Sequence, residues 1–186
     1  EMLLIKKQFD PHLLFNTINN IDSLILRDAV AASDYLNKLS DIIRFVLYET
    51  RTEKILLSKE IEYMEKYIAL KIRTANENYV HFSVTGSIGD KVIAPMIFIP
   101  FIENAFKHTT NKKVENAITI NIFIDDASIR LICENKYDSK AVQQTSGGLG
   151  NELIQKRLSL IYPERHILEV TNDNEFYRVN LTIRNG

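Results

Sequence analysis

The chain has 186 residues, of which 45% are hydrophobic and 25% charged, an ordinary composition that allows one large domain or a small module with a compact domain. A formal net charge of −1 gives no electrostatic reason to expect nucleic acid or an anionic membrane surface as a partner. The single cysteine, Cys133, excludes an internal disulfide, and a reducing compartment fits.

The chain begins at Glu1 inside an apolar, helix-compatible run, Met2 to Ile5, rather than with a signal peptide. We therefore expect a fragment, with any sensor or membrane anchor in an upstream part. The longest apolar run, from Val92 to Ile102, contains two prolines and is too short to span a bilayer.

The first predicted helix runs from Leu13 onward and follows Pro11, which removes a backbone N–H and should either kink the helix or begin it afresh. One face of this helix is apolar, at positions 14, 18, 21 and 25. Another face carries Gln8, His12 and Asn16 at four-residue steps, so these polar side chains stack where solvent or a partner can reach them. On pattern alone, His12 is an ordinary surface histidine.

The stretch from Gln8 to Asn16 resembles Q-x-x-P-H-F-L-F-N, a motif of the sensor histidine kinases of the LytS type, in which the histidine accepts a phosphoryl group. The resemblance implies that His12 is the acceptor. The stretch departs from the motif at Asp10, where the family usually has Asn, and at Leu13, where it has Phe.

The residue that orients His12 stays open. Many histidine kinases have an acidic residue directly after the histidine for this purpose, but Leu13 occupies that place here. Asp10, Asn16 and Glu103 are the three candidates. The side-chain amide of Asn16 is also a candidate for directing a water toward phosphohistidine or phosphoaspartate.

A short connection over residues 28–33 leads to a second predicted helix with one broad apolar face. Its inward positions are Leu36, Leu39, Ile43 and Val46, widened by Tyr35, Ile42 and Phe45. Two such helices cannot cover each other completely, so we expect either pairing with a second copy into a four-helix bundle or packing against the rest of the same chain. Because histidine kinases carry the acceptor on a dimeric hairpin, the resemblance favours the homodimer.

A third helix is predicted from Lys59 to about Thr74, with Ser58 as its N-cap. The segment 76–78 ends it, and from Tyr79 to Gly86 the apolar period changes to two, which predicts a strand. We place the domain boundary here, with phosphoacceptor and dimerisation helices over 1–75 and a second domain over 76–186. Arg44-Phe45 and the run 57–60 resemble the R-Y and L-x-x-E elements of the same kinases.

The stretch 94–109 predicts an apolar helix whose end abruptly becomes polar, with Glu103, Asn104, Lys107 and His108. Such an end is either an exposed, salt-bridged terminus or a magnesium–phosphate site, where Asn supplies a neutral oxygen to a hard cation, Lys a charge for phosphate and Glu a base or a water ligand. The segment resembles P-L-V-E-N-A-I-K-H of the ATPase domain that histidine kinases share with GHKL proteins. The resemblance implies that Asn104 holds the Mg²⁺ of ATP, with Lys107 and His108 beside the nucleotide.

Two strands are predicted over 117–124 and 128–134, joined by a turn at Asp125-Asp126. Residues 136–146 lack any period and predict a mobile loop. A glycine cluster then begins a helix; such a cluster is usually a flexible hinge, but its backbone N–H groups can also approach phosphates. Two more alternating strands, 167–171 and 176–183, close the chain around a turn at 172–174.

The glycine segment resembles G-I-G-L-x-N-V-x-x-R-L…Y-P of the same ATPase domain, aligned without a gap through Arg157-Leu158 and the run 161–163. The resemblance implies that Gly148 and Gly150 contact the nucleotide and that the loop before them is the ATP lid. The Leu and Asn that follow the glycines in the family are Asn151 and Leu153 here.

The family also has an Asp, in a D-x-G pattern after the strand that precedes the lid, which accepts a hydrogen bond from the adenine amino group. Asn135 stands at that register, without a glycine two residues on. An amide oxygen can accept this hydrogen bond, but without the charge of a carboxylate. The alternative is that Asp138 supplies the carboxylate from the lid.

From Val80 onward the predicted order is strand, helix, strand, strand, loop, helix, strand, strand, which makes a two-layer α+β sandwich. The resemblance implies a Bergerat-type ATP-binding domain that follows a dimeric four-helix bundle. It implies a cytoplasmic kinase domain of a membrane protein, which uses ATP and Mg²⁺ to phosphorylate His12 and passes the phosphoryl group to the receiver domain of a response regulator, with the LytTR type as the candidate.

Two other classes of function compete with this prediction. One is a non-catalytic signalling scaffold with a degenerate nucleotide site. The other is a GHKL-type serine kinase or ATPase, which would leave the motif from Gln8 to Asn16 without a purpose.

Overall fold

The computed structural model describes residues 10–72, 78–109, 112–137, 148–173 and 175–184. These residues divide into two compact units. The first holds the described residues up to 72 together with Asp90–Pro95, and the second holds those from 78 to 89 and from Met96 onward. Within the described ranges, no helix is both long enough and apolar enough to cross a membrane.

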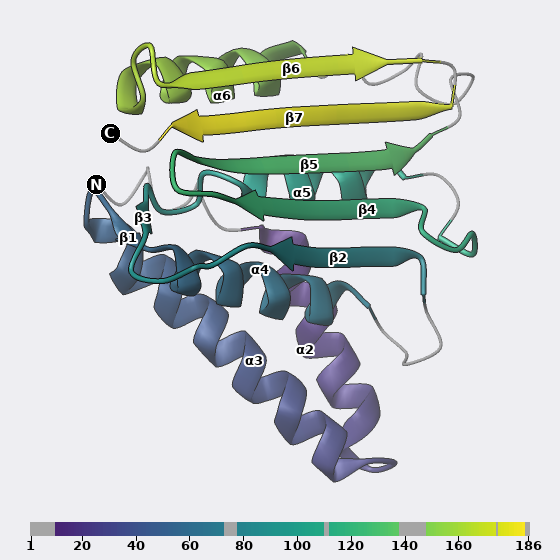
Figure 1. Cartoon of the computed structure of the whole chain (residues 1–186). Coiled ribbons are helices and arrows are strands. Elements are labelled where there is room, and N and C mark those ends of the chain that lie inside the picture. The colour runs from purple at the N-terminus through teal and green to yellow at the C-terminus, as the bar shows by residue number, and fades with distance from the viewer. Residues whose placement is uncertain (1–9, 73–77, 110–111, 138–147, 174, 185–186) are drawn as a thin grey trace. The chain divides into compact units, whose positions relative to one another are not determined.

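The first unit is built on three helices (Figure 1). They are α2 (Pro11–Ile25), α3 (Ala29–Tyr48) and α4 (Leu57–Lys71), with a single 3₁₀ turn, η1 (Glu49–Arg51), after α3. The helices α2 and α3 form a hairpin. A two-residue strand, β1 (Ile55–Leu56), pairs antiparallel with β3 (Val92–Ile93), which is why Asp90–Pro95 belongs to this unit.

Pro11 begins α2 rather than kinking it. The helix starts at this residue, where a missing backbone N–H costs nothing because the first amides of a helix have no intrahelical partner. Asp10 is the N-cap, and its side chain accepts hydrogen bonds from the backbone N–H groups of His12 and Leu13.

The predicted apolar stripe of α2 is not the buried face. Leu13 and Thr17 are the buried residues of this helix, whereas Ile18 is 47% exposed and Ile25 is 52% exposed. On α3 the buried face is close to the prediction, with Leu39, Ile42, Phe45 and Val46 all buried. Leu36, predicted to face inward, is 55% exposed. Among the described residues, part of the apolar surface of the hairpin is therefore uncovered.

Two predicted helix starts are corrected. The connection before α3 is shorter than residues 28–33, because Asp28 caps the helix at once by accepting from the backbone N–H of Ala31 at 2.9 Å. The helix α4 begins at Leu57, so Ser58 lies inside its first turn, and the predicted Ser58 cap is wrong. The pairing of β1 with β3, which sequence periodicity did not predict, sets this earlier start.

The second unit is a five-stranded sheet with the order β2-β4-β5-β7-β6. The strands are β2 (Val80–Thr85), β4 (Ile118–Ile124), β5 (Ser128–Lys136), β6 (His166–Asn172) and β7 (Phe176–Arg184). The strands β2 and β4 are parallel, and the other neighbours are antiparallel. The helices α5 (Ile99–His108) and α6 (Gly148–Ile161) lie on one face (Figure 1), which confirms the predicted two-layer α+β fold.

The core of this unit lies between the sheet and its helices. Buried residues alternate along the neighbouring strands β4 and β5: Ile118, Ile120, Ile122 and Ile124 on β4, and Ile129, Leu131, Cys133 and Asn135 on β5. The residues between them are mostly half-buried, as expected for a sheet with one covered face. Burial raises the pKa of the Cys133 thiol to about 12, with a smaller effect from the charge of Glu134, so this thiol is unreactive.

The helix α5 begins at Ile99, later than the start predicted at residue 94. Two prolines account for the difference: Pro100 fits the first turn of a helix, and Pro95 belongs to the irregular segment before it. Within that segment Met96 has a φ of 56°, a left-handed conformation that is unusual for a residue with a side chain. The Arg157 guanidinium of α6 donates to the Met96 carbonyl at 2.8 Å and so ties α6 to the segment that precedes α5.

Replacing the cap of α3 tests why this helix starts where it does. Asp28→Ala should lower the free energy of unfolding by about 1 kcal/mol, because a backbone N–H in the first turn of α3 loses its acceptor. Asp28→Asn should cost much less, since an amide oxygen can accept the same hydrogen bond. Urea denaturation measures the change, with Asp22→Ala on the exposed face of α2 as control. An equal loss for both alanine variants would contradict this role of Asp28.

Candidate functional site

His12 lies in the first turn of α2, and its side chain is exposed. Asn16 follows one helical turn later and is also exposed, so the two side chains share an accessible face of the helix. Both features agree with the prediction for this stretch. Gln8, the third residue of the predicted polar face, lies outside the described residues.

Both oxygens of the Asp10 carboxylate accept hydrogen bonds. One oxygen, Oδ1, accepts from the backbone N–H groups of His12 at 3.0 Å and Leu13 at 3.3 Å. The other, Oδ2, accepts from the Tyr67 hydroxyl at 3.3 Å and from the Lys71 ammonium at 3.2 Å. Asp10, one of three candidates for orienting His12, therefore acts on the backbone of His12 in this structure.

The charge state of Asp10 follows from these contacts. Burial by itself raises the pKa of this carboxyl, but the charge and hydrogen bond of Lys71, together with the two backbone N–H donors, outweigh it and hold the pKa below its usual value. Asp10 is consequently ionised around neutral pH. His12 thus has a negative charge two residues before it and a positive charge, that of Lys71, behind that carboxylate.

The helix α5 has one buried side and one polar side. Its buried residues are Ile99, Phe101, Ile102, Ala105 and Phe106. Glu103, Asn104 and His108 are half-buried and Lys107 is exposed, so the four predicted residues gather on the accessible side toward the end of the helix. Burial lowers the pKa of His108, and the neighbouring positive charge of Lys107 lowers it further, so its imidazole is neutral around pH 7.

Asn135 is the buried polar residue nearest the end of β5. Its side chain is only 2% exposed, on the helix-covered face of the sheet, and among the described residues its amide nitrogen Nδ2 has no hydrogen-bond partner. On the same face, Cys133 Sγ donates to the Phe101 carbonyl of α5 at 3.7 Å. A buried amide without a partner costs roughly 1–3 kcal/mol. A ligand with hydrogen-bonding edges, such as a purine base, would satisfy it.

The predicted glycine site coincides with the start of a helix, since α6 begins at Gly148 and includes Gly150. Its first backbone N–H groups have no intrahelical acceptor, and anions bind well at such ends. Asp138 and the predicted lid lie outside the described residues. Sequence analysis missed the role of Arg157 as an anchor for the Met96 carbonyl; its only sequence signal was its place in the R-L element.

A magnesium site made wholly of protein ligands is not present in the described part of the chain, where no three His, Cys, Asp or Glu side chains converge. Magnesium in proteins commonly takes one or two protein oxygens together with waters and substrate phosphates. The Asn104 amide and the neighbouring Glu103 carboxylate are oxygen donors of that kind.

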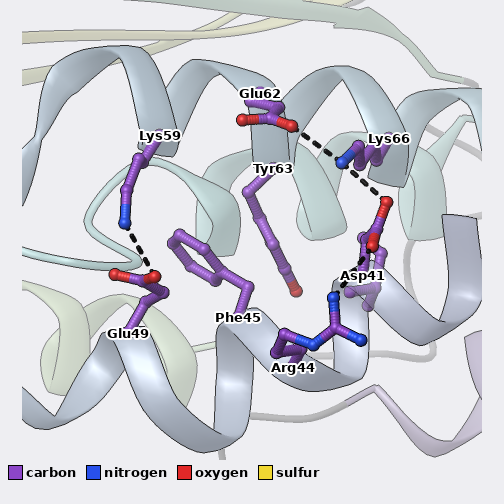
Figure 2. Close-up of a pocket in the computed structure, with 9 residues that line it drawn as sticks. Asp41, Arg44, Phe45, Glu49, Lys59, Glu62, Tyr63 and Lys66 are labelled. Atoms are coloured by element: carbon purple, nitrogen blue, oxygen red, sulfur yellow. Dashed lines mark hydrogen bonds and ion pairs between the residues drawn. The ribbon is translucent and has the colours of Figure 1, made fainter.

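A pocket of about 230 Å³ lies between α3 and α4 in the first unit (Figure 2). Phe45 and Tyr63 stack inside it with ring centroids 4.4 Å apart. Its cations are already paired, Lys59 with Glu49 at 2.7 Å and Lys66 with two carboxylates. None of the residues predicted for the nucleotide lines this pocket, which is a seam between packed helices.

The chain matches known proteins both in sequence and in fold. A family model described as histidine kinase matches residues 1–78, which include His12. The sensor protein kinase HptS of Staphylococcus aureus (strain USA300) is 29% identical over 157 residues, which cover 82% of this chain. The chain spans about 30% of the length of HptS.

Two solved structures share the fold. The nucleotide-free catalytic domain of the histidine kinase ThkA superimposes with a TM-score of 0.51 at 16% identity, over 70% of this chain and 95% of that domain. The histidine kinase domain of the blue-light activated kinase EL346 from Erythrobacter litoralis gives a TM-score of 0.50 at 13% identity, over 97% of this chain and 91% of that one. At these identities the likeness concerns the fold. The family match and the relative over most of the chain make this chain similar to histidine kinases. The solved structures show that it also shares their fold.

Proposed function

We propose that this chain is the catalytic part of a two-component sensor histidine kinase of the LytS type, which phosphorylates His12 with ATP and passes the phosphoryl group to an aspartate of a response regulator. The observation that carries the proposal is the exposed His12 in the first turn of α2, within the residues that match the histidine kinase family. The α+β unit that follows has the fold of kinase catalytic domains. A LytTR-type regulator is the partner that we infer.

When bound, ATP supplies the phosphoryl group and a magnesium ion offsets the charge of its phosphates. His12 attacks the γ-phosphorus through an unprotonated ring nitrogen; a nitrogen–phosphorus bond forms, the bond from the γ-phosphorus to the β,γ-bridging oxygen breaks, and ADP leaves. Because a loose transition state asks little covalent chemistry of the protein, the residues of the chain act by position and charge. The exposed amide of Asn16 shares the accessible face of His12, where it would direct a water toward phosphohistidine or phosphoaspartate, so that hydrolysis releases phosphate.

We assign the nucleotide to the polar side of α5, the start of α6 and Asn135. Asn104 would hold the magnesium ion, Glu103 a water or a proton, and Lys107 a phosphate. His108 is neutral, so it can donate and accept a hydrogen bond without adding charge. The backbone at Gly148 and Gly150 would receive phosphate oxygens, and the buried amide of Asn135 would meet the adenine edge.

We infer that the hairpin of α2 and α3 pairs with a second copy. Its uncovered apolar residues support this: Phe15 is 63% exposed, Ile25 52% and Leu36 55%. A groove of about 310 Å³ also runs along α3 between Leu36 and Tyr48. Because HptS is named a sensor kinase and is far longer than this chain, we further propose that the whole protein is a membrane-anchored sensor.

The first test replaces the acceptor. His12→Gln should abolish phosphorylation of the protein by Mg-ATP and leave ATP affinity unchanged, because the exposed His12 belongs to a different unit from the nucleotide residues. Labelling with γ-³²P-ATP, followed by a check for acid-labile and base-stable phosphate, gives the result. His81→Gln, at an exposed position of β2, is the matched control and should label normally. Phosphate that remains on the His12 variant would refute the assignment, and an unlabelled wild type would favour a scaffold.

A second test concerns Asn104. Asn104→Ala should remove magnesium-dependent ATP binding and all labelling while the melting temperature changes little, since a half-buried polar side chain contributes little to packing. Isothermal titration with and without Mg²⁺ measures the loss. Asn121→Ala, a half-buried amide on the uncovered face of the sheet, should bind ATP normally. A collapse of the melting temperature in Asn104→Ala alone would show that Asn104 is a structural residue.

A third test uses the unpartnered amide. Asn135→Asp gives a charge to the acceptor oxygen that would meet the adenine amino group, and it should tighten ATP binding about fivefold, equivalent to about 1 kcal/mol. GTP should gain less, because guanine presents a carbonyl where adenine presents an amino group. Titrations with both nucleotides measure this, with Asn121→Asp as control. If Asp138→Asn weakens ATP binding instead, the lid supplies the carboxylate, and no effect in either variant would contradict this mode of adenine binding.

A further inference from the structure

The side chain of Asp10, the N-cap of α2, connects the first turn of α2 to α4. Asp10 Oδ1 accepts from the backbone N–H of His12 at 3.0 Å, while Oδ2 accepts from the Lys71 ammonium at 3.2 Å. The Tyr67 hydroxyl, one turn earlier on α4, donates to the same Oδ2 at 3.3 Å. The chain of contacts from Lys71 and Tyr67 through the carboxylate to His12 therefore connects residues 59 and 55 positions apart.

The part of α4 that holds Asp10 is itself firmly placed. Tyr67 is 1% exposed and stacks on Tyr63, with ring centroids 6.5 Å apart, and Tyr63 stacks on Phe45 of α3. The Lys71 ammonium lies 5.5 Å from the centroid of the Tyr67 ring, within reach of a cation–π interaction. Both donors thus rest on a buried aromatic stack, and a side chain in such a setting has few alternative rotamers.

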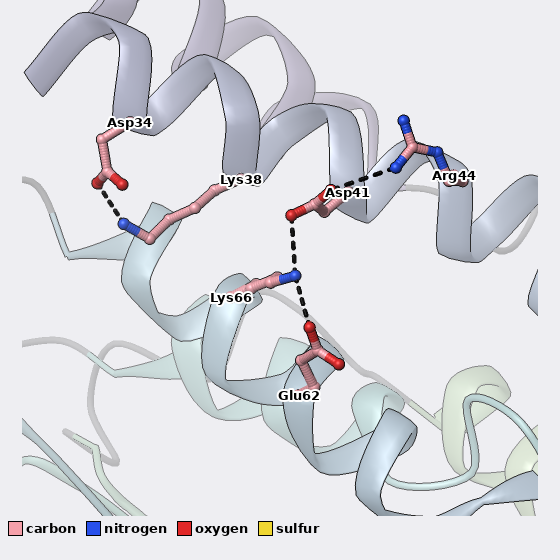
Figure 3. Close-up of polar contacts among 6 residues, drawn as sticks. All are labelled: Asp34, Lys38, Asp41, Arg44, Glu62 and Lys66. Atoms are coloured by element: carbon pink, nitrogen blue, oxygen red, sulfur yellow. Dashed lines mark hydrogen bonds and ion pairs between the residues drawn. The ribbon is translucent and has the colours of Figure 1, made fainter. Parts of the chain in front are cut away.

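Ion pairs fix α4 on α3 in the same region (Figure 3). The Lys66 ammonium lies 2.8 Å from Asp41 of α3 and 2.8 Å from Glu62 of its own helix. Its side chain is 26% exposed, close to the 21% of Lys71. Lys66 and Lys71 thus each form an ion pair with an aspartate of another segment. The partner of Lys66 is Asp41 of α3, whereas the partner of Lys71 is Asp10, the cap before His12.

Charge gives Lys71 a second effect on the reaction. The incoming phosphoryl group is negative, and an uncompensated carboxylate two residues before the acceptor would repel it. Lys71 places a positive charge directly on that carboxylate, and the lowered pKa of Asp10 reports the same attraction. Where the family motif has a neutral Asn, this chain has a charged cap and a lysine that offsets it.

We propose that Tyr67 and Lys71 are positioning residues for the phosphorylation of His12: they hold the Asp10 carboxylate, and through it the backbone of the first turn of α2, in the orientation in which the imidazole receives phosphate. The inference rests on the proposed function. It assigns to α4 a part in catalysis that neither the sequence motif nor the fold comparison contains.

The experiment compares matched lysines in the full chain. Lys71→Met should lower the rate of His12 labelling at saturating Mg-ATP by roughly 10- to 100-fold, the loss expected when a reacting group is misplaced by about 1 Å, and should leave the KM for ATP unchanged. Lys71→Arg should restore most of the rate, because it keeps both the charge and a donor. Tyr67→Phe should lower the rate less than Lys71→Met does. Lys66→Met should leave the rate near that of the wild type.

A second readout separates positioning from general loosening of the fold. The amide hydrogens of His12 and Leu13 should exchange faster in Lys71→Met than in the wild type or Lys66→Met, as followed by NMR. In an Asp10→Asn background, where a neutral amide still caps the helix, Lys71→Met should have little further effect on labelling.

Three outcomes would overturn the inference. They are an unchanged labelling rate in Lys71→Met, equal losses in Lys71→Met and Lys66→Met, or an equal loss with and without the Asp10 carboxylate. A wild type that accepts no phosphate on His12 would refute the proposed function itself, so the two failures are distinguishable.

Discussion

The hydrogen bonds of the Asp10 carboxylate set the geometry of the first turn of α2, where His12 lies. A helix leaves its first backbone N–H groups without partners, and here one carboxylate oxygen satisfies two of them, including that of His12. The second oxygen is held by α4, so the start of α2 is tied to a helix that follows it by some fifty residues. An N-cap usually contacts only its own helix, but Asp10 also contacts α4. The backbone of His12 is therefore held in place while its side chain stays exposed.

The second unit places its polar groups where an apolar layer ends. The helix α5 buries Phe101, Ile102 and Phe106 against the sheet, and this burial leaves Glu103 and Asn104 at the margin of the covered layer. Asn135 lies within the layer itself, with an amide nitrogen that no described residue satisfies. Buried polar groups are nearly always hydrogen-bonded, so this amide nitrogen is open to an acceptor from a ligand or a water.

The hairpin shows the reverse condition, apolar groups that remain in contact with solvent. Phe45 of α3 is buried against Tyr63 of α4. No described residue covers the groove from Leu36 to Tyr48 or the exposed Ile25 of α2. Exposed apolar side chains that gather on one element are typical of an interaction site. A second hairpin supplies the same apolar chemistry, which is why we favour a second copy over an unrelated partner.

The sequence by itself determined the element order of the sheet unit and the residues that make the candidate site. Alternation over β4 and β5 and the turn at Asp125 depend on neighbours along the chain, and they were predicted nearly to the residue. The predicted groups of α5 do gather on its accessible side, because helical spacing alone decides which residues share a face. The motif around His12 is likewise a continuous stretch of sequence, so it can be recognised without the tertiary structure.

Tertiary structure decided the features that join distant residues. The pairing of β1 with β3 moved the start of α4 and made Ser58 an ordinary helical residue, and no local pattern reports a two-residue strand. Which face of α2 is buried depends on the packing of α3 and α4. The buried residues are therefore Leu13 and Thr17, and not the apolar stripe that periodicity predicts. Asp10 was one of three candidates for orienting the ring of His12. In the structure its carboxylate accepts instead from backbone N–H groups and from two side chains of α4. Lys71 and Tyr67 became its partners because packing, which sequence spacing does not encode, brings α4 to the start of α2.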